Sequence, residues 1–568
     1  MKAMKEAILK RLNQVAAGLD ISPESVRLEY PENAEHGDFS TNMAMAAAKK
    51  AGLAPRSLAE KIVGSFSEKL PNGVASLDIA GPGFINFRVD EKFFTEEIVK
   101  IADGGAEYGW GTAHAGKKVM VEYTDPNPFK EIHIGHLMSN AIGEAVSRLI
   151  QSQGADVIRA NWQGDVGPHV AKAIWGAMHT TAKMSDFASK SAFWGKAYAE
   201  GAKAYADDPA AKTDIDHINK MVYDRSDPGV NAIYDQGRKD CLDAFDQIYA
   251  RLGTKFDNYF FEGTEGRNGE AVVREFQKKG IFEESEGAIV FKGEQYGLHT
   301  RVFITSHGLP TYETKEIGLN IEKFKLYPDL DQSIIVTAAE QSDYFKVLLK
   351  VFELIRPEIA EKTRHMSHGM MRFKSGKMSS RTGNVVSAES LIGEIKKLVA
   401  EKIADRGFDA ALADEISDQI AIGAIKYSIL RSSPGSDIIF DSAASISFEG
   451  DSGPYLQYSA VRARSIIEKS ITNDQKSKIK MPEKVGLLER LISRFPDLVL
   501  RARTEYAPQI IAGYLIELAG AFNSFYASQT ILDENDPLSV YRVAVTQAFL
   551  TTMTNGLWLL GIKVPKKM

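Results

Sequence analysis

The stretch of residues 118–149 constrains the fold of this chain more than any other. It opens with an apolar run that predicts a buried strand, and Pro126 and Pro128 then exclude helix from the residues that follow. A helical pattern begins at about His136, and apolar residues recur along one face of it at Met138, Ile142, Ala145 and Leu149. The stretch therefore predicts a strand, a loop and a helix that packs one face on a sheet.

The start of this helix has the composition of an anion-binding site. The first turn of a helix presents unpaired backbone N–H groups and the positive end of the helix dipole. His133 and His136 add two imidazoles that can donate to phosphate oxygens, and Gly135 lets a nucleotide approach the backbone. Two surface histidines would give the same pattern, whereas a metal site is disfavoured because the chain has one cysteine and no nearby carboxylate set. The pattern indicates a nucleotide site.

A second polar segment, residues 373–384, carries positive charge. It is small, polar and glycine-containing, and it includes Lys374, Lys377 and Arg381. This composition predicts a loop that brings cations to a polyanion. A solvated loop without a ligand is the alternative for such a segment seen alone, but its occurrence together with the histidine-bearing helix favours the nucleotide.

Together, His-Ile-Gly-His at 133–136 and Lys-Met-Ser-Ser-Arg at 377–381 resemble the two signatures, HIGH and KMSKS, of class I aminoacyl-tRNA synthetases. Other segments narrow the resemblance to the arginyl-tRNA synthetase family. These segments are Glu122-Tyr123, Pro126-Asn127 and Lys130 before the first signature, Gly164-Asp165 after the next strand, Thr311-Tyr-Glu-Thr-Lys-Glu-Ile317, and Gln341. The resemblance covers nearly the whole chain.

With 568 residues the chain is too long for one hydrophobic core, and we expect three or four domains. Residues 1–110 are expected to form an α+β domain, and residues 390–568 an all-α helical bundle. Residues 115–385 alternate strand and helix patterns, which predicts a doubly wound, parallel, Rossmann-like catalytic sheet with a helical insertion at about 170–290. The strands of that sheet are expected at residues 119–123, 156–160, 301–305 and 333–337.

The resemblance implies that both flanking domains bind tRNA. In the N-terminal domain, which would contact the elbow of the tRNA, Phe84 could stack on a base while Asn86 reads its edge. Phe84 in the core and Asn86 in a turn are the alternative. In the helical bundle, Tyr455, Tyr458 and Arg462 share one helical stripe and would face the anticodon loop, although core tyrosines would explain the same spacing.

The implied reaction uses ATP as a substrate. An amino-acid carboxylate attacks the α-phosphorus to give an aminoacyl-adenylate, and the terminal ribose of tRNA then takes the acyl group, so that catalysis is mainly positioning and charge stabilisation. Mg²⁺ is implied as a partner of the phosphates. The residues expected to bind ATP are His133, Gly135, His136, Lys377, Met378 and Ser379.

This chain departs from the general class I loop signature at one position. Ser380 stands where that signature has its second lysine, and Lys130 is the expected substitute. We therefore count Lys130 with His133, His136 and Lys377 as catalytic residues.

Selection of L-arginine requires acidic groups and a flat ring, because a guanidinium offers five coplanar donors. Tyr312 and Glu316, spaced i, i+4, supply a ring and a charge, and Glu122, Asn127 and Gln341 match family positions that hold the amino acid. The family usually has Asp where this chain has Glu316, so the pocket geometry differs. A surface Glu316 paired with Lys315 or Lys346 is the alternative.

Composition bounds the cellular setting. The net charge of −6 argues against a non-specific nucleic-acid coat but not against a local basic face. The single cysteine, Cys241, excludes an internal disulfide framework and fits a reducing cytoplasm. We see no 18-residue apolar run and no signal-peptide core, and we expect a cytoplasmic monomer without a membrane partner that binds tRNA(Arg), L-arginine and ATP.

Three other functions remain open. They are a non-catalytic tRNA-binding relative, a class I synthetase for another amino acid, and a small nucleotidyltransferase. The last would not need the helical C-terminal third, and a cysteine enzyme would need a zinc site that one cysteine can hardly build.

Overall fold

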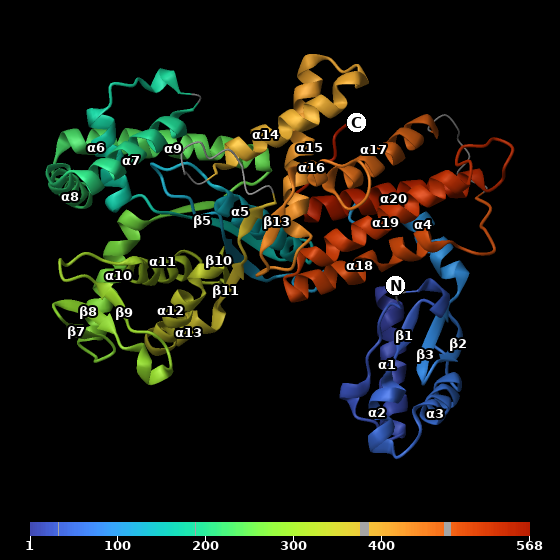
Figure 1. The fold of residues 1–568 in the computed structure, drawn as a ribbon. Helices are drawn as coiled ribbons and strands as arrows, with labels where there is room; N and C mark the ends of the chain where they lie inside the picture. The colour runs from blue at the N-terminus through green and yellow to red at the C-terminus, as the bar shows by residue number, and fades with distance from the viewer. Residues whose placement is uncertain (32, 188, 375–385, 471–478) are drawn as a thin grey trace. The chain divides into compact units, whose positions relative to one another are not determined.

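The computed structural model describes residues 1–31, 33–187, 189–374, 386–470 and 479–568. Contacts divide the chain into two compact units (Figure 1). The first unit comprises residues 1–111, 455–504 and 513–557, and the second comprises residues 112–454, 505–512 and 558–568. The last residues of the chain thus belong to the unit that contains the signature helix.

The second unit is built on a parallel sheet. Within the described residues its strand order is β11-β10-β4-β5-β6, and every neighbouring pair is parallel. The predicted strands at 119–123, 156–160 and 333–337 are confirmed as members of this sheet. Its strands are β4 (Lys118–Glu122), β5 (Asp156–Gln163), β6 (Asn258–Phe261), β10 (Gln332–Ala338) and β11 (Thr363–His368).

The predicted fourth strand, residues 301–305, is wrong as a member of the parallel sheet. Residues Arg301–Ile304 do form a strand, β9, but it pairs antiparallel with β8 (Ala288–Phe291), which in turn pairs with β7 (Glu283–Ser285). A short apolar run looks the same in either kind of sheet, because its partner lies elsewhere in the sequence. Strands β6 and β11, which the sequence did not predict, are the two edge strands of the parallel sheet.

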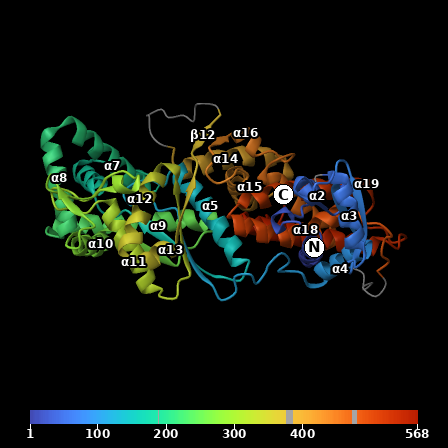
Figure 2. The ribbon, with the colours of Figure 1, turned by 90° about the horizontal axis from the view of Figure 1, so that it is seen from below.

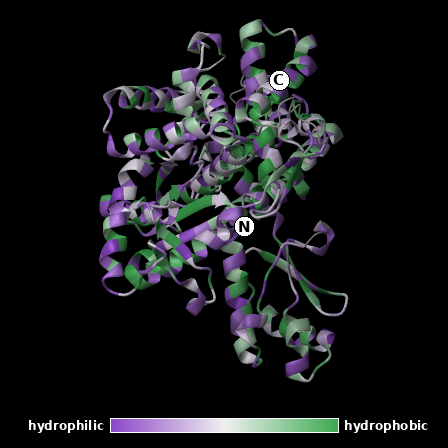
Figure 3. Ribbon diagram, turned by 60° about the vertical axis from the view of Figure 1, so that its left-hand side comes forward, coloured by the Kyte–Doolittle hydropathy of each residue, from purple (hydrophilic) through white to green (hydrophobic). Residues whose placement is uncertain are grey.

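Helix α5 (Ile134–Gln151) follows β4 and packs on β4, β5 and β10. Its buried residues include the predicted stripe Met138, Ile142, Ala145 and Leu149, so the periodicity is confirmed. Figure 3 shows apolar residues concentrated on the inner strands and polar residues on the outer helices. Other helices around the sheet and the β7–β9 hairpin are α10 (Glu262–Gln277), α11 (Tyr312–Leu326), α12 (Ser342–Ile355) and α13 (Pro357–Lys362).

The helical insertion forms a group of its own, in which α6 packs on α7 and α8, and α7 packs on α9 (Figure 1); Figure 2 shows α7 and α8 from below. The prediction of a helical insertion at 170–290 is wrong at three strands, because β6 belongs to the parallel sheet and β7 and β8 form a hairpin, although α10 between them is a helix. The helices are α6 (Pro168–His179), α7 (Lys190–Asp207), α8 (Pro209–Asp224) and α9 (Pro228–Leu252).

Beyond residue 385 the described chain is mostly helical, as expected, but one short strand interrupts it. Strand β13 (Ile438–Phe440) pairs in parallel with β12 (Met371–Phe373). The helices of this part are α14 (Ala388–Ile403), α15 (Ala410–Leu430), α16 (Ser442–Ser445), α17 (Gly453–Ser470), α18 (Leu487–Glu505), α19 (Pro508–Ser528) and α20 (Ser539–Leu559).

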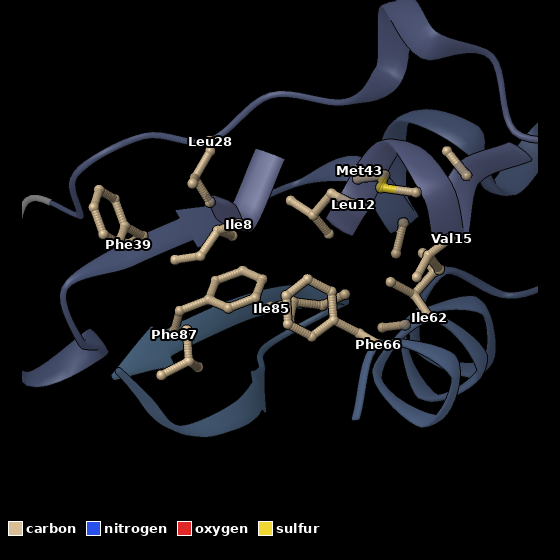
Figure 4. Packing of buried hydrophobic residues seen from close by; sticks show 14 of the residues in the cluster. Ile8, Leu12, Val15, Leu28, Phe39, Met43, Ile62, Phe66, Ile85 and Phe87 are labelled. Carbon is tan, nitrogen blue, oxygen red and sulfur yellow. The ribbon is translucent and has the colours of Figure 1, made fainter. Parts of the chain in front are cut away.

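The N-terminal part of the first unit is an α+β structure, as predicted. An antiparallel sheet of order β1-β3-β2 packs with the surrounding helices around a core that includes Ile8, Phe39, Phe66 and Phe87 (Figure 4). The elements are α1 (Lys2–Gly18), β1 (Phe39–Thr41), α2 (Met43–Ala51), α3 (Pro55–Ser67), β2 (Val74–Ala80), β3 (Phe84–Val89) and α4 (Glu91–Gly104). Short 3₁₀ helices lie at Pro23–Ser25, Ala34–His36, Met184–Asp186, Gly293–Tyr296, Ala339–Gln341 and Ala404–Arg406.

Among the described residues, α19 is long and apolar enough to cross a membrane by length and composition alone, although we expected no such run. Core helices of water-soluble proteins also have these properties. Ile511, Leu515, Leu518 and Phe522 on α19 are fully buried inside the protein. These residues give α19 the character of a core helix.

Candidate active site

Two histidines, His133 and His136, cap the first turn of α5. His133 is the N-cap residue, and its Nδ1 accepts a hydrogen bond from the backbone N–H of Gly135 at 3.1 Å. The backbone N–H of His133 donates to Nδ1 of His136 at 3.2 Å, which completes a reciprocal cap. The two rings stack with centroids 3.7 Å apart. The expectation that His133, Gly135 and His136 lie together at a helix start is confirmed.

These hydrogen bonds determine which ring nitrogens face a ligand. Burial, followed by the charge of Lys130, lowers the pKa of His133. Burial, followed by His133 and Lys130, lowers the pKa of His136 well below its usual value. Both imidazoles are therefore neutral at neutral pH, and each Nδ1 is an acceptor, so each Nε2 carries the proton. Two neighbouring Nε2–H donors at a helix N-terminus suit a phosphate.

Lys130 lies in the same site. Its Nζ is 4.7 Å from the ring centre of Tyr198, and its charge acts on both histidines. Burial lowers the pKa of Lys130. A partly desolvated ammonium interacts more strongly with an incoming anion than one in bulk water.

The predicted ATP-binding residues Lys377, Met378 and Ser379 lie outside the described residues. The chain on either side of that segment does lie at α5. Before it, β12 contacts α5. After it, the N–H of Ile134 donates to Val386 O at 3.2 Å and the N–H of Ala388 donates to Ile132 O at 2.8 Å. The described residues on both sides of that segment therefore lie at α5.

A cluster of buried acidic side chains lies at the carboxyl end of the sheet, where we expect the amino-acid pocket. Glu122 ends β4 and forms an ion pair of 2.7 Å with Lys323 of α11, and both side chains are fully buried. Glu316, two turns before Lys323 on α11, is also buried and accepts a hydrogen bond from Asn320 at 3.1 Å. Ligands of parallel α/β sheets bind at this end of the strands.

The alternative of a surface Glu316 is wrong. Lys315 instead pairs with Glu262 at 2.6 Å, and Lys346 pairs with Asp343 at 2.8 Å. Glu316 is 7% exposed and accepts a hydrogen bond from Asn320. It is therefore a buried residue and not a surface one.

The cluster holds buried carboxyl groups whose pKa values are raised. Burial, followed by the neighbouring Glu122, raises the pKa of Glu316 to about 8. Burial, followed by Glu122, likewise raises the pKa of Asp125 well above its usual value. Lys323 offsets Glu122 but only partly relieves the other two carboxyl groups. A bound cation would restore both to the ionised form.

Asn127 lies beside the glycine that follows β5. A Cβ atom on Gly164 would be 1.9 Å from Oδ1 of Asn127, so only glycine permits this approach. The next residue, Asp165, is buried and holds the surrounding elements through Tyr234 OH at 2.8 Å, Arg238 Nη1 at 2.9 Å and the N–H of Gly263 at 2.9 Å. The Gly-Asp turn thus fixes α9 and α10 relative to the end of β5.

Two predicted arginine-binding residues are exposed. Tyr312 begins α11 one turn before Glu316, as predicted, and its side chain is 58% exposed. Gln341 follows β10 at the start of α12, and its side chain is also exposed. Tyr312 lies on the same helix as Glu316, and Gln341 lies at the N-cap of α12. Neither side chain is packed in the core.

Sequence reasoning missed several charged groups of this pocket. Lys323 lies seven residues after Glu316 and so on the same helical face, a spacing that could have revealed it. Glu262 and its partner Lys315 come from distant segments, and no local signal joins them. Asp125 lies in the proline loop with a positive φ of 48° and accepts the N–H of Trp162 at 2.8 Å.

The N-terminal part of the first unit contains a cavity of 680 Å³, and Phe84 and Asn86 both line it. Phe84 is 41% exposed, so its assignment to the core is wrong. Asn86 is buried in β3, not in a turn, and it accepts from Ser40 Oγ at 2.8 Å and donates to Asp78 at 3.2 Å. The ring is thus accessible, whereas the amide is held within the sheet.

The tyrosine–arginine stripe on α17 is confirmed as one connected cluster. Arg462 donates to Tyr458 OH at 3.2 Å and to Asn523 Oδ1 at 2.5 Å. Asn523 of α19 in turn donates to Tyr455 OH at 2.9 Å. Arg462 also lies over the ring of Tyr526, 5.1 Å from its centre. The cluster combines stacking rings with polar groups.

Among the described residues no group of three His, Cys, Asp or Glu side chains is arranged to hold a metal ion. Mg²⁺ commonly binds through substrate phosphates and few protein ligands. The described residues therefore supply no metal cage, and no step below depends on one.

Three family models match the chain. They are the catalytic domain of class I tRNA synthetases (R) at residues 101–442, the DALR anticodon binding domain at residues 456–568, and the arginyl tRNA synthetase N-terminal domain at residues 2–89. The first of these alone covers more than half of the chain.

Curated relatives and solved structures agree with these models. An arginine–tRNA ligase of Clostridium botulinum is 30% identical over 97% of both chains, and one of Clostridium acetobutylicum is 29% identical over 99% of this chain and 100% of its own. The arginyl-tRNA synthetase structure from Thermus thermophilus has a TM-score of 0.82 at 23% identity, with full coverage of both chains. The Plasmodium falciparum structure has a TM-score of 0.80 at 19% identity, covering 100% of this chain and 99% of its own. This chain belongs to the arginyl-tRNA synthetase family of class I aminoacyl-tRNA synthetases.

Proposed function

We propose that this protein is an arginine–tRNA ligase, which activates L-arginine with ATP and transfers it to the 3′ end of tRNA(Arg). The observation that carries the proposal is the buried carboxyl group of Glu316, in a chain of this family whose helix α5 begins with the histidine cap. Family relatives bear the same name. A guanidinium is the cation whose planar donors best match carboxylates in such a pocket.

In the first step, the carboxylate of arginine attacks the α-phosphorus of ATP and pyrophosphate leaves. The Nε2–H groups of His133 and His136 and the backbone of the helix start would donate to phosphate oxygens as negative charge develops. Gly135 would allow the close approach. We propose that Lys377, Met378 and Ser379 complete the ATP site, as the family resemblance implies, and that Mg²⁺ enters with the nucleotide.

In the second step, the terminal ribose hydroxyl of tRNA attacks the carbonyl of the adenylate and AMP leaves. No side-chain nucleophile is needed. The enzyme's contribution is to hold both reactants in line and to stabilise charge.

Arginine would be held along its whole length. We propose that Glu316 receives the guanidinium, that Tyr312 at the entrance covers its plane, and that Glu122, Asn127 and Gln341 hold the amino-acid end. The buried position of Glu316 supports the first assignment, because a carboxylate inside the protein favours a bound cation strongly.

The tRNA contacts are proposed at two places. In the N-terminal part, the exposed ring of Phe84 opens on the 680 Å³ cavity and could stack on an unpaired base, with Asn86 on the cavity wall. On the helical bundle, Tyr455, Tyr458 and Arg462 would meet the anticodon loop. We further propose that the protein acts as a cytoplasmic monomer, an assignment that rests on the sequence alone.

The test is to charge total tRNA with each of the twenty amino acids. Arginine alone should be attached. Efficient attachment of another amino acid would identify a different class I synthetase. ATP–pyrophosphate exchange that stays absent in the presence of arginine and tRNA would identify a non-catalytic tRNA-binding relative.

Lys130→Ala should lower the rate of arginine-dependent ATP–pyrophosphate exchange by about 100- to 1,000-fold, the usual effect of removing one charge-stabilising group. The reason is that Lys130 is half-desolvated beside both histidines. Lys172→Ala is the matched control, because Lys172 also lies over a tyrosine of the helical insertion, 4.3 Å from the ring of Tyr205. Equal effects of the two substitutions would contradict a role for Lys130 at the phosphates.

Phe84→Ala should weaken tRNA binding by about 5- to 100-fold, since stacking on a base contributes about 1–3 kcal/mol. The dissociation constant of tRNA(Arg), measured by filter binding, is the readout. Leu70→Ala serves as the control, because Leu70 is similarly exposed in the same part of the chain. An unchanged dissociation constant for the Phe84 variant would exclude the stacking contact.

A further inference from the structure

The end of α5 that lies away from the histidines is joined to the end of the chain. Arg148, in the last turn of α5, donates from Nη1 to the carbonyl of Trp558 at 2.9 Å and from Nη2 to the carbonyl of Gly253 at 2.9 Å. Its Nε donates to Glu144 at 2.6 Å, and its guanidinium carbon is 5.1 Å from the ring centre of Trp558. One side chain therefore connects α5 to the ends of α20 and α9.

Lys426 on α15 connects to the same two chain ends. Its Nζ donates to the carbonyl of Leu252, the last residue of α9, at 2.6 Å and to the carbonyl of Gly561 at 2.8 Å. The side chain is fully buried. Burial, followed by the charge of Arg148, lowers the pKa of Lys426 to about 7, and its amino group can donate to both carbonyls in either protonation state.

Two glycines make this arrangement possible. Gly253 and Gly561 have φ angles of 70° and 67°, which L side chains rarely adopt. A Cβ atom on Gly561 would lie 2.8 Å from Nζ of Lys426. The carbonyl groups at helix C-termini carry partial negative charge and favour donors such as Arg148 and Lys426.

The network continues from α5 to the acidic pocket. Glu144, which pairs with Arg148, accepts from Tyr123 OH at 2.5 Å and from Arg159 Nε at 3.0 Å. Tyr123 directly follows Glu122, and its ring lies where a Cβ on Gly143 would be, 2.2 Å from that position. A buried polar network of this kind has one geometry, whereas apolar packing alone tolerates small slides.

We propose that Arg148 and Lys426 are positioning residues, which hold the nucleotide-binding helix α5 in place by securing it to the final residues of the chain. This inference rests on the proposed function. Helix α5 behaves as a rod of about 27 Å, at 1.5 Å per residue, so a shift at Arg148 displaces His133 and His136 at its other end. A misplacement of about 1 Å can slow a reaction about 100-fold.

The arginine pocket provides an internal comparison. Glu316 lies on α11, and its side chain accepts a hydrogen bond from Asn320 of the same helix. Loosening of α5 is therefore expected to impair ATP use much more than arginine binding. Global destabilisation would instead impair both.

The main variants are Arg148→Lys, which keeps a cation but cannot make all three hydrogen bonds, and Gly561→Ala, which displaces Lys426. Each should lower kcat/KM for ATP in pyrophosphate exchange by at least about tenfold, while the dissociation constant of L-arginine, measured by calorimetry, changes less than about twofold. Arg251→Gln is the matched control, because the Arg251–Asp418 pair of 2.6 Å also joins α9 to α15 but is formed by no atom of α5 or of the last residues of the chain. The control should keep wild-type ATP kinetics.

Kinetics of both variants within twofold of the wild type would overturn the proposal, as would equal losses for ATP and arginine. If Gly561→Ala melts below the assay temperature, Arg148→Lys decides alone, because it retains the buried charge. Failure of the wild-type protein to charge arginine would instead overturn the proposed function, so the two failures are distinguishable.

Discussion

Glu316→Gln is expected to lower kcat/KM for L-arginine by about 30- to 1,000-fold and to leave KM for ATP nearly unchanged. Removing one charge from a buried pair commonly costs about 2–5 kcal/mol, and about 1.4 kcal/mol corresponds to a factor of ten. The reason is that Glu316 is buried in a pocket whose only nearby ammonium, among the described residues that act on it, already pairs with Glu122. Pyrophosphate exchange in the presence of tRNA measures both constants.

Glu313→Gln is the matched control for this prediction. Glu313 lies on the same helix, three residues earlier, and pairs with Arg301 at 3.5 Å. It should leave arginine use unchanged within about threefold, because it lies outside the pocket's acidic pair. Equal losses in the two variants would show that α11 as a whole, rather than the carboxylate of Glu316, supports arginine use.

The pH dependence of kcat/KM for arginine provides a second test of the role of Glu316. Its pKa in the free protein is raised to about 8, first by burial and then by Glu122, so that the carboxyl group is mostly protonated at pH 7. Arginine binds to the carboxylate and must displace that proton. Arginine kcat/KM should therefore rise up to tenfold per pH unit below about pH 8 and level off above it. Glu316→Gln should abolish this rise, and its persistence in the variant would assign it to another group.

Lys323→Met should lower the stability of the second unit by about 3–5 kcal/mol, because it leaves the buried carboxylate of Glu122 without its cation. The double variant Glu122→Gln, Lys323→Met should recover much of that loss, since both charges are then removed. The midpoint of urea unfolding, followed by tryptophan fluorescence, measures the stability. Arginine binding should remain weak in the double variant, because the negative charge of Glu122 is lost.

Equal stability of the single and double variants would contradict a direct interaction between these two side chains. Lys325→Met is the control. Lys325 lies two residues after Lys323 on α11, and its exposed side chain forms an ion pair with Glu322. Its effect on stability should be below about 1 kcal/mol, as is usual for surface pairs.

The local sequence was sufficient to predict the pair of histidines at the start of α5. The reciprocal cap of His133 and His136 uses only backbone and side-chain atoms within four residues, so the pattern and its geometry come together. The same holds for the stripe on α17, where helical spacing placed Tyr458 and Arg462 side by side. Family resemblance, carried by motifs along the whole chain, supplied the rest of the expected site.

Strand membership could not be read in this way. Residues 301–305 and 333–337 have similar apolar patterns, yet β9 joins a hairpin and β10 joins the parallel sheet. The choice depends on which distant strand offers hydrogen bonds, and a local pattern does not contain that information.

The sequence by itself determined the α/β catalytic fold and the paired histidines at the start of α5, because these depend on spacing within short segments, and the family resemblance supplied the residues of the proposed arginine pocket. Only the tertiary structure decided that Lys323 neutralises Glu122, that Glu316 is buried, and that Arg148 and Lys426 hold the end of the chain. These contacts join residues hundreds of positions apart or change pKa values through burial. Both effects arise only when distant segments pack together and exclude water.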